Sequence, residues 1–415
     1  MAGAQNTTGT AARSAAVEAL NLILGQGAML AELGEPNLPP ADRARARRLI
    51  DEVLRKLEPI DRVLSPFLRK SPPLAVRNIL RLAVAELSSG TAAHGVVNSA
   101  VSIARMNKKT SHSAGLINAV LRQIDPEALA KQPVQKLPRW LRQPLVHAWG
   151  RDAVAMIEQV QAQTPPLDLS LRSDTAPEGE LLPTKSLRLH DFGQVSALKG
   201  YAEGAWWVQD AAAALPAKVL QAQKGEKVLD LCAAPGGKTL QMASAGAEVT
   251  ALDISEHRVT RLRENLSRMG LSAQVVVADA LAWEPSEKFD AILLDAPCSA
   301  TGTIRRHPDL PFAKDGSEVA PLAELQAQLL DRALGWLKPN GRIVFATCSL
   351  LPAEGEDQLS AVLERHPNLI AEKVEVEGID PSWWSAANGL RLRPDYWADK
   401  GGMDGFFVMR LRYQP

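Results

Sequence analysis

Apolar residues between positions 12 and 124 recur every three or four places, a spacing that predicts a succession of amphipathic helices. Val17, Leu20 and Leu24 share one such face, and Ile79 and Leu82 belong to another. Helix-breaking residues separate the segments, at Pro39-Pro40, Pro72-Pro73 and Gly90. The first third of the chain is therefore predicted to be an all-α bundle of about six or seven helices.

The pattern changes after this bundle. Residues 125–160 contain four prolines and two tryptophans, which predicts a linker followed by a short helical element. From Pro165 onward apolar residues alternate with polar ones instead, as at Leu167, Leu169 and Leu171. Because alternation is typical of strands, a small α+β module is expected before the main domain.

From Lys227 onward strands and helices alternate regularly. The predicted strands are residues 228–232, 248–252, 274–278, 291–294 and 342–346. The predicted helices are residues 239–245, a helix capped by Ser255 and stopped by Gly270, and residues 322–337. Such alternation predicts a doubly wound parallel sheet with helices on both faces, and ligands then bind at the carboxyl ends of the strands.

Composition excludes several classes of protein. The chain has 415 residues, 46% of them hydrophobic and 23% charged, which excludes a disordered chain, a coiled coil and a collagen-like fibre. No stretch approaches the roughly 18 apolar residues of a membrane span. The segment 15–33 lacks the basic start and apolar block of a secretory signal. A soluble cytoplasmic protein of two or three domains, with no membrane association, is expected.

The net charge of zero hides an asymmetry. Residues 1–132 hold 17 basic and 11 acidic residues, a net charge of +6, so the remainder carries −6. A basic first third is consistent with binding of a polyanion, and equally with ordinary solvated helix faces. The basic residues cluster at Arg43, Arg45, Arg47, Arg48, Arg105, Lys108 and Lys109.

The first predicted strand of the main domain runs into the turn Cys232-Ala233-Ala234-Pro235-Gly236-Gly237-Lys238. A phosphate-binding P-loop would need a glycine where Cys232 stands, and the dinucleotide fingerprint G-x-G-x-x-G is absent. A nucleoside-binding turn for S-adenosylmethionine needs only the close approach that glycines allow, together with carboxylates for the ribose and the adenine.

Carboxylates follow the successive strands. With Asp230 counted at the first, Asp253, Asp279 and Asp295 make four acids at four consecutive predicted strand ends. A single aspartate is most simply a helix or turn cap. Four at successive strands favour a cofactor that offers several hydroxyl and amine donors.

The cysteines are Cys232, Cys298 and Cys348, and their spacing fits neither a zinc site nor a disulfide framework, so no metal is expected. A cysteine is commonly a small buried residue. Two of these, however, follow adjacent strands beside Asp295. A thiolate that adds to C6 of cytosine turns C5 into a nucleophile toward a methylsulfonium group. This chemistry does not choose between Cys298 and Cys348.

These motifs resemble the RNA cytosine-5 methyltransferase family, and over the whole chain its bacterial ribosomal small-subunit branch, the Sun/Fmu type. The matching stretches are residues 208–210, 232–238, 295–302, 304–309, 347–349, 391–394 and 404–407, with Asp253 and Asp279. The first third is similar to NusB-type RNA-binding domains, on the segment 116–122. The resemblance implies a Rossmann-like class I methyltransferase domain, with residues 1–130 NusB-like, 131–205 a linker and small RNA-contacting module, and 206–415 catalytic.

The resemblance also assigns roles to residues. It implies that Cys348 is the nucleophile, that Cys298 assists product release, and that Asp295 contacts both cofactor and target base. S-adenosylmethionine would be held by the following residues: Cys232, Ala233, Ala234, Pro235, Gly236, Gly237, Lys238, Asp253, Asp279 and Asp295. The run Arg305-Arg306-His307 is expected to face the substrate and hold phosphate.

The expected activity is therefore methyl transfer from S-adenosylmethionine to C5 of a cytosine in 16S ribosomal RNA. The partner is this RNA or a small-subunit assembly intermediate, and the chain is expected to be a monomer. The same chemistry on tRNA and a non-catalytic RNA-binding assembly factor are the alternatives. The chain departs from the family pattern at Glu354-Gly355-Glu356, usually Glu-Asn-Glu, and at Ser173-Asp174, usually Val-Asn.

Overall fold

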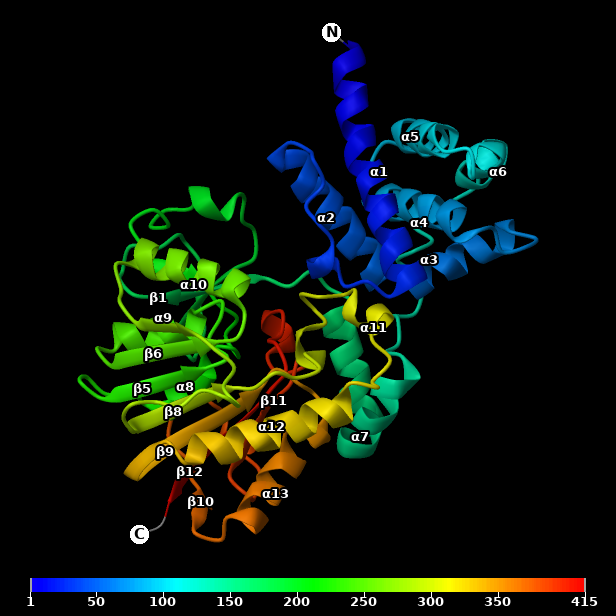
Figure 1. The fold of residues 1–415 in the computed structure, drawn as a ribbon. Coiled ribbons are helices and arrows are strands. Elements are labelled where there is room, and N and C mark those ends of the chain that lie inside the picture. Colours follow the sequence, from blue (N-terminus) through cyan, green and yellow to red (C-terminus); the bar gives the residue numbers. More distant parts are fainter. Residues whose placement is uncertain (1, 414–415) are drawn as a thin grey trace. The chain divides into compact units, whose positions relative to one another are not determined.

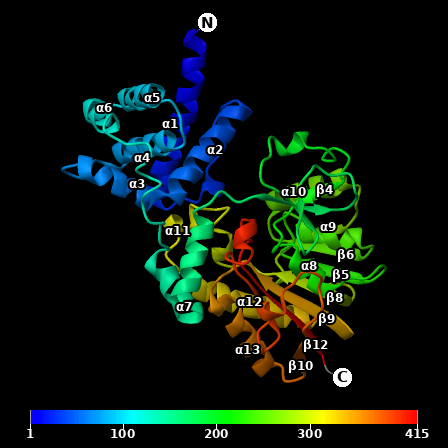
Figure 2. The ribbon, with the colours of Figure 1, turned by 180° about the vertical axis from the view of Figure 1, so that it is seen from behind.

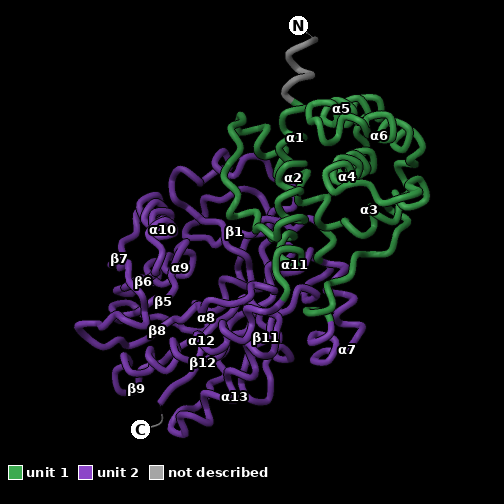
Figure 3. The backbone as a smooth tube through the Cα atoms, turned by 45° about the vertical axis from the view of Figure 1, so that its right-hand side comes forward, with its two compact units in different colours: residues 1–142, 161–163, 306–315 green, residues 143–160, 164–305, 316–415 purple. Residues whose placement is uncertain are grey.

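The computed structural model describes the backbone of residues 2–413 and the side chains of residues 9–413. The chain forms two compact units (Figure 3). Unit 1 comprises residues 1–142, 161–163 and 306–315, and unit 2 comprises residues 143–160, 164–305 and 316–415.

Unit 1 is a helical bundle around one apolar core (Figure 1). Its main helices are α1 (Ala2–Gln26), α2 (Pro40–Arg55), α3 (Leu57–Leu64), α4 (Leu74–Ser88), α5 (Ala93–Met106) and α6 (Ala114–Leu121). The predicted faces are confirmed, since Val17, Leu20, Ile79 and Leu82 are all buried. The bundle of helices is thus confirmed over the described residues.

A short segment from much later in the sequence completes unit 1. Helix α11 (Leu310–Ala313) packs against α1, and Phe312 lies against the apolar core. The backbone N–H of Leu30 donates to the Asp309 carboxylate at 2.7 Å. Because these residues are about 280 positions apart in the sequence, no local pattern predicted their contact.

The segment after the bundle is more helical than predicted. Helix α7 spans Arg139–Gln161, 23 residues, in place of the expected short element. It is divided by a kink at Gly150, whose φ of 83° is left-handed. The prolines that indicated a linker lie mostly before α7, and Pro144 lies in its second turn.

The small sheet of unit 2 confirms the predicted strands of the middle region. Its strands are β1 (Leu167–Leu171), β2 (Glu180–Leu181), β3 (Ser186–Leu189) and β4 (Trp206–Val208), in the antiparallel order β2-β3-β1-β4. Asp168 and Arg188 form an ion pair at 2.7 Å with both side chains fully buried. The pair ties β1 to β3 across the middle of the sheet.

The large sheet holds the predicted parallel strands at its centre. The strands are β5 (Lys227–Leu231), β6 (Glu248–Asp253), β7 (Gln274–Val277), β8 (Phe289–Asp295), β9 (Leu337–Thr347), β10 (Leu369–Ala371), β11 (Gly389–Leu392) and β12 (Phe406–Tyr413). The order is β10-β12-β9-β8-β5-β6-β7, and β11 pairs with β12. Strands β5 to β9 pair in parallel, whereas β12 is antiparallel to β9, β10 and β11.

Helices cover both faces of this sheet, as predicted. Helices α12 (Val319–Leu334) and α13 (Glu356–Arg365) lie over one face. The other face carries α8 (Leu215–Leu220), α9 (Gly237–Ser244) and α10 (Glu256–Met269), and α8 lies over β8 and β9 (Figure 2). Among the described helices, none combines the length and apolarity that crossing a membrane requires.

Helix α10 shows how directly a local sequence can fix an element. The hydroxyl of Ser255 accepts a hydrogen bond from the backbone N–H of Arg258 at 3.3 Å, and Gly270 ends the helix at a φ of 58°. Its buried residues are the four that the spacing predicts, Val259, Leu262, Leu266 and Met269.

The buried pair in the small sheet leads to a stability prediction. Arg188→Met should lower the free energy of unfolding by about 3–5 kcal/mol, because it leaves the Asp168 carboxylate buried without its cation. Urea denaturation followed by circular dichroism measures the change. The surface pair Lys400–Glu180, at 2.6 Å, supplies the control, and Lys400→Met should cost less than about 1 kcal/mol. Equal losses in both variants would contradict the argument.

Candidate active site

The loops that carry the predicted residues gather at the carboxyl edge of the large sheet. Strand order reverses between β5 and β8, since β6 and β7 extend to one side and β9 to the other. Asp253 ends β6, Asp295 ends β8, and Cys348 directly follows β9. In parallel sheets this reversal point leaves room for a ligand between the diverging loops.

The turn after β5 is held by the end of β6. The N–H of Ala233 donates to the carbonyl of Leu252, and the N–H of Ala234 donates to Asp253 Oδ2, both at 3.0 Å. Gly236 has a φ of 104°, and a Cβ there would lie 3.0 Å from the Leu262 side chain. Glycine is therefore required where the turn enters α9.

Asp253 and Asp279 each bind their own local backbone. Asp253 is buried, and its second oxygen accepts from the N–H of Ser255 at 3.0 Å. Asp279 is exposed, and one oxygen accepts from the N–H of Leu281 at 2.9 Å. Both therefore act as caps, while each carboxylate oxygen keeps capacity for a second donor such as a ribose hydroxyl.

Arg258 is a site residue that the sequence analysis missed. Its guanidinium donates to the carbonyl oxygen of Ala234 and lies 3.5 Å from Asp253. It thus covers the turn and the carboxylate from the solvent side, half exposed. Its position in the first turn of α10, directly after Asp253, is the signal that could have indicated this contact.

Asp295 forms an ion pair with Lys238. Lys238 Nζ lies 2.7 Å from Asp295 Oδ2 and 5.4 Å from the centre of the Phe406 ring. Burial alone would lower the pKa of Lys238, but the Asp295 carboxylate raises it above its ordinary value. The ammonium group therefore stays charged beside Asp295, which remains partly exposed toward the loop edge.

The two cysteines after β8 and β9 lie side by side. Cys298 Sγ and Cys348 Sγ are 3.4 Å apart, within hydrogen-bond reach for sulfur. The hydrogen bond with Cys348 and burial raise the pKa of Cys298 well above its ordinary value. Cys298 is therefore a neutral thiol that can donate to Cys348 at neutral pH.

Cys232 differs from this pair in position and chemistry. It lies in the turn after β5 with a φ of 60°. Burial raises its pKa to about 12, and the Asp295 and Asp253 carboxylates add to the effect. Its thiol is therefore neutral at physiological pH.

Asp230 does not belong to the carboxyl edge. It is fully buried inside β5, and Oδ2 accepts from the Thr239 hydroxyl at 2.5 Å. Oδ1 has no hydrogen-bond partner among the described residues. Burial raises the pKa of Asp230 to about 7. Its position inside β5 and its hydrogen bond with Thr239 on α9 hold its side chain in the interior.

The basic run 305–307 was expected to face the substrate, and the structure contradicts this for Arg305. Arg305 is fully buried and does not face a substrate. Its Nη2 lies 2.5 Å from Asp210, and its Nε lies 2.6 Å from Asp404. The sequence could not show this, because the two carboxylates are 95 and 99 residues away. Arg306 and His307 belong to unit 1.

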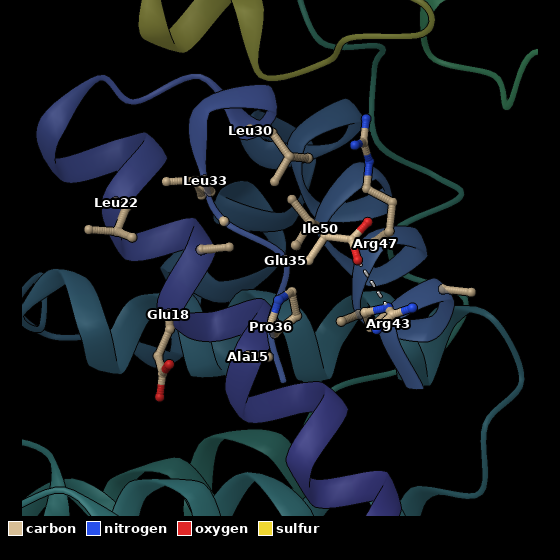
Figure 4. Close-up of a pocket in the computed structure, with 14 residues that line it drawn as sticks. Ala15, Glu18, Leu22, Leu30, Leu33, Glu35, Pro36, Arg43, Arg47 and Ile50 are labelled. Carbon is tan, nitrogen blue, oxygen red and sulfur yellow. Dashed lines mark ion pairs between the residues drawn. The ribbon is translucent and has the colours of Figure 1, made fainter. Parts of the chain in front are cut away.

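The arginine cluster of unit 1 is largely neutralised within that unit. Arg45 pairs with Glu86 at 3.2 Å, and Arg47 pairs with Asp51 at 3.1 Å. Arg43 lies 3.5 Å from Glu35 beside a pocket of about 470 Å³ between α1 and α2 (Figure 4). The other cluster, Arg105, Lys108 and Lys109, is exposed.

The buried Asp230 leads to a prediction about pH. The folded protein keeps this carboxyl protonated where the unfolded chain, with a pKa near 3.8, has ionised it. Its contribution to the free energy of unfolding therefore falls as pH rises from about 4 to 7, by a few kcal/mol in total, and is flat above. Asp230→Asn should remove this slope.

Urea denaturation at several pH values between 4 and 8 measures the difference between wild type and Asp230→Asn. The exposed residue Glu264 provides the control, since Glu264→Gln should leave the profile parallel to that of the wild type. Parallel profiles for Asp230→Asn as well would show that Asp230 ionises normally in the folded protein.

Comparisons with known proteins agree with this architecture. The model of the family described as 16S rRNA methyltransferase RsmB/F matches residues 217–412, and the NusB family model matches residues 10–126. The chain is 36% identical over 394 residues to ribosomal RNA small subunit methyltransferase B of Klebsiella pneumoniae, covering 86% of this chain and 90% of that protein. The protein of the same name from Cronobacter sakazakii is 34% identical, covering 96% and 98%.

Solved structures show the same fold. The crystal structure of PH0851 superposes with a TM-score of 0.74 at 21% identity, covering 97% of this chain and 98% of that one. NSun6 from Pyrococcus horikoshii, solved with SFG, superposes with a TM-score of 0.58 at 18% identity, covering 66% of this chain and 98% of that one. The resemblance deduced from the motifs is confirmed: the chain belongs to the RsmB/F methyltransferase family and carries a NusB-family domain.

Proposed function

We propose that this protein transfers the methyl group of S-adenosylmethionine to C5 of a cytosine in 16S ribosomal RNA, through a covalent bond between Cys348 and C6 of the base. The observation that carries the proposal is the pair of thiols, 3.4 Å apart, on the loops of adjacent strands. The Lys238–Asp295 ion pair lies on the same edge of the sheet. Family membership supports the methyl-transfer chemistry.

The residues at this edge fit S-adenosylmethionine. Gly236 and Gly237 carry no side chain where the turn enters α9, so the backbone there is open to close approach by a ligand. Asp253 and Asp279 offer acceptors for ribose hydroxyls and an adenine amine, and Ile254, 67% exposed, offers an apolar surface beside them. When bound, the cofactor supplies an electrophilic methyl group on a sulfonium centre. We assign it to the turn 232–238 and to Asp253, Asp279 and Asp295.

The two thiols differ in a way that supports Cys348 as the nucleophile. The Lys238 ammonium interacts electrostatically with Cys348, so the cation of the Lys238–Asp295 pair acts on this sulfur. Cys298, in contrast, has a raised pKa, caused first by its hydrogen bond with Cys348 and by burial, with the Glu354 carboxylate adding to it. Cys298 therefore keeps its proton, and we assign the attack on the base to Cys348.

The proposed sequence of bonds follows from these roles. The Cys348 thiolate adds to C6 of cytosine, which makes C5 nucleophilic, and C5 takes the methyl group. Solvent water then takes the C5 proton, the electrons of that C–H bond restore the double bond between C5 and C6, and the bond between sulfur and C6 breaks to release the methylated base and the Cys348 thiolate. We assign Cys298 to this release step, and Asp295, held by Lys238, to the orientation of the base.

An RNA substrate agrees with the charge distribution and with access to the site. A base must leave its stack to reach thiols on strand-end loops, so an unpaired nucleotide or an incompletely assembled particle is favoured. The exposed basic residues Arg105, Lys108 and Lys109 offer contacts for phosphate. The relatives named above are ribosomal RNA small subunit methyltransferases, which supports 16S ribosomal RNA as the target.

Cysteine variants test the proposed roles. Wild type, Cys348→Ala and Cys298→Ala are incubated with labelled S-adenosylmethionine and unmodified 16S ribosomal RNA, and methyl transfer and denaturation-resistant protein–RNA adduct are measured. Cys348→Ala should lose both signals, by about 1,000-fold or more for transfer, because the nucleophile is gone. Cys298→Ala should accumulate adduct, because release is blocked.

The matched control is Asp357→Asn, an exposed carboxylate whose loss should leave both signals unchanged. Full transfer by Cys348→Ala would refute its assignment as the nucleophile. Transfer to tRNA but not to 16S ribosomal RNA would show that tRNA is the substrate. No transfer by wild type to any RNA would favour a non-catalytic RNA-binding role.

A further inference from the structure

Glu354 is a buried carboxylate that the proposed reaction does not use. It ends the short 3₁₀ turn Pro352–Glu354 and has no solvent exposure. Its Oε1 accepts from the backbone N–H of Ser299 at 2.8 Å, and its Oε2 accepts from the Ser299 hydroxyl at 2.5 Å. One carboxylate therefore fixes both the backbone and the side chain of the residue that follows Cys298.

The same residue also holds the strand that leads to the second thiol. The hydroxyl of Thr347 donates to the backbone carbonyl of Glu354 at 2.7 Å, and Thr347 is the last residue before Cys348. Glu354 thus contacts the neighbour of each cysteine, one through its side chain and the other through its backbone. The 3.4 Å between the two sulfur atoms is the distance that these bonds hold.

A layer of hydroxyl groups reinforces this connection. The Ser299 hydroxyl lies 3.2 Å from that of Ser349, which in turn lies 3.2 Å from that of Thr301. All three side chains are buried. The residue after each cysteine is a serine, so the two loops meet through matching hydroxyl groups beneath the thiols. This layer joins the loops directly, and Glu354 anchors it from one end.

The carboxylate is stabilised by neutral donors. Gln326 Nε2 on α12 donates to Glu354 Oε1 at 3.1 Å and to the carbonyl of Pro297 at 2.8 Å. Among the described residues, no cation forms an ion pair with Glu354, because Arg391 pairs with Glu356 instead. Burying a carboxylate without a cation is costly, and several hydrogen bonds are needed to offset the cost. Burying an apolar side chain at this position would cost less free energy than burying a carboxylate. We therefore expect a specific role for the carboxylate.

The neighbouring glycine belongs to the same arrangement. Gly355 stands where the family pattern has asparagine. A Cβ at this position would collide with the Arg391 guanidinium and the Phe407 ring. Arg391 donates to the carbonyl of Ser349 at 2.5 Å and so supports the loop of Cys348 from the other side.

We propose that Glu354 is the positioning residue of the cysteine pair: it holds the loops of Cys298 and Cys348 together so that the two sulfur atoms stay in contact. The roles of the two thiols in methyl transfer rest on the proposed function, whereas their juxtaposition does not. The raised pKa of Cys298, to which the hydrogen bond with Cys348 and burial contribute first and Glu354 last, agrees with this arrangement.

Disulfide formation measures the juxtaposition without any RNA or cofactor. Diamide accepts two electrons and two protons from a pair of thiols, which join as a disulfide while diamide becomes its hydrazine. The rate of the bond between Cys298 and Cys348 is followed by peptide mapping in wild type, Glu354→Ala, Glu354→Gln and Asp357→Asn. Peptide mapping also separates this bond from any reaction of Cys232.

Glu354→Ala should slow formation of this disulfide by about tenfold or more, because the loop of Cys298 loses both hydrogen bonds from Ser299 to the carboxylate and the sulfur atoms separate. The rate for Glu354→Gln should lie between those of wild type and Glu354→Ala, since its amide oxygen still accepts one hydrogen bond from Ser299. Asp357→Asn, an exposed neighbour of the same charge, should equal the wild type. Cross-linking of both Glu354 variants at the wild-type rate would overturn the proposal.

Methyl transfer supplies the second readout. Glu354→Ala and Glu354→Gln should lower kcat by about 100-fold and 10-fold, respectively, with an unchanged KM for S-adenosylmethionine, because misplacement affects the reacting atoms only. A raised KM for S-adenosylmethionine together with lower thermal stability would indicate a merely structural role and would contradict the proposal. If Glu354→Ala does not fold, Glu354→Gln and Ser299→Ala carry the same comparison.

The two readouts distinguish the proposals. A wild type without methyl transfer to any RNA would overturn the proposed function, while the cross-linking comparison would still decide the role of Glu354. A wild type that transfers methyl groups, with variants that cross-link and react normally, would overturn the role of Glu354 alone.

Discussion

The buried guanidinium of Arg305 makes the interactions on which the candidate active-site edge of unit 2 depends. It binds Asp210 before α8 and Asp404 before β12, and its remaining nitrogen donates to the carbonyl of Gly401. Three segments far apart in the sequence therefore contact one another through the Arg305 guanidinium. Because an unpaired buried charge is so costly, the two carboxylates and the arginine fix these segments as a unit. The loop that carries Cys298 begins after β8 and leads to this anchor, and the N–H of Gly405 donates to the carbonyl of Gly302 in that loop at 2.8 Å.

Above this anchor, charge divides the site into two sides. The Lys238–Asp295 pair lies on the side of the β5 turn, while the Glu354 carboxylate lies behind Cys298. The Lys238 cation interacts with Cys348, whereas the Glu354 carboxylate adds to the raised pKa of Cys298, which the hydrogen bond with Cys348 and burial cause first. The two thiols therefore have different electrostatic surroundings, and these come from loops other than their own.

Local sequence was sufficient for the helices of unit 1, for the parallel strands of unit 2 and for the family. The spacing of Val259, Leu262, Leu266 and Met269 determined α10, and the alternation at Leu167 and Leu169 determined β1. The glycine turn and the strand-end carboxylates indicated a methyltransferase edge. Periodicity did not identify β10, β11 and β12, which sequence analysis left without assignment. Strand β12 is the antiparallel partner of β9, and β10 and β11 pair with β12 in turn. Their place therefore depends on pairing between distant parts of the chain rather than on a local pattern.

The sequence by itself determined which residue types stand at the strand ends. The reason is that parallel strands, once recognised from their pattern, all end at the same edge of the sheet. Tertiary structure decided what those residues do there. It turned Asp230 inward, placed Arg305 between two carboxylates, and brought Glu354 to the neighbours of both cysteines. The physical reason is that solvation and charge pairing depend on groups that are distant in sequence, and burial gives these pairings their strength.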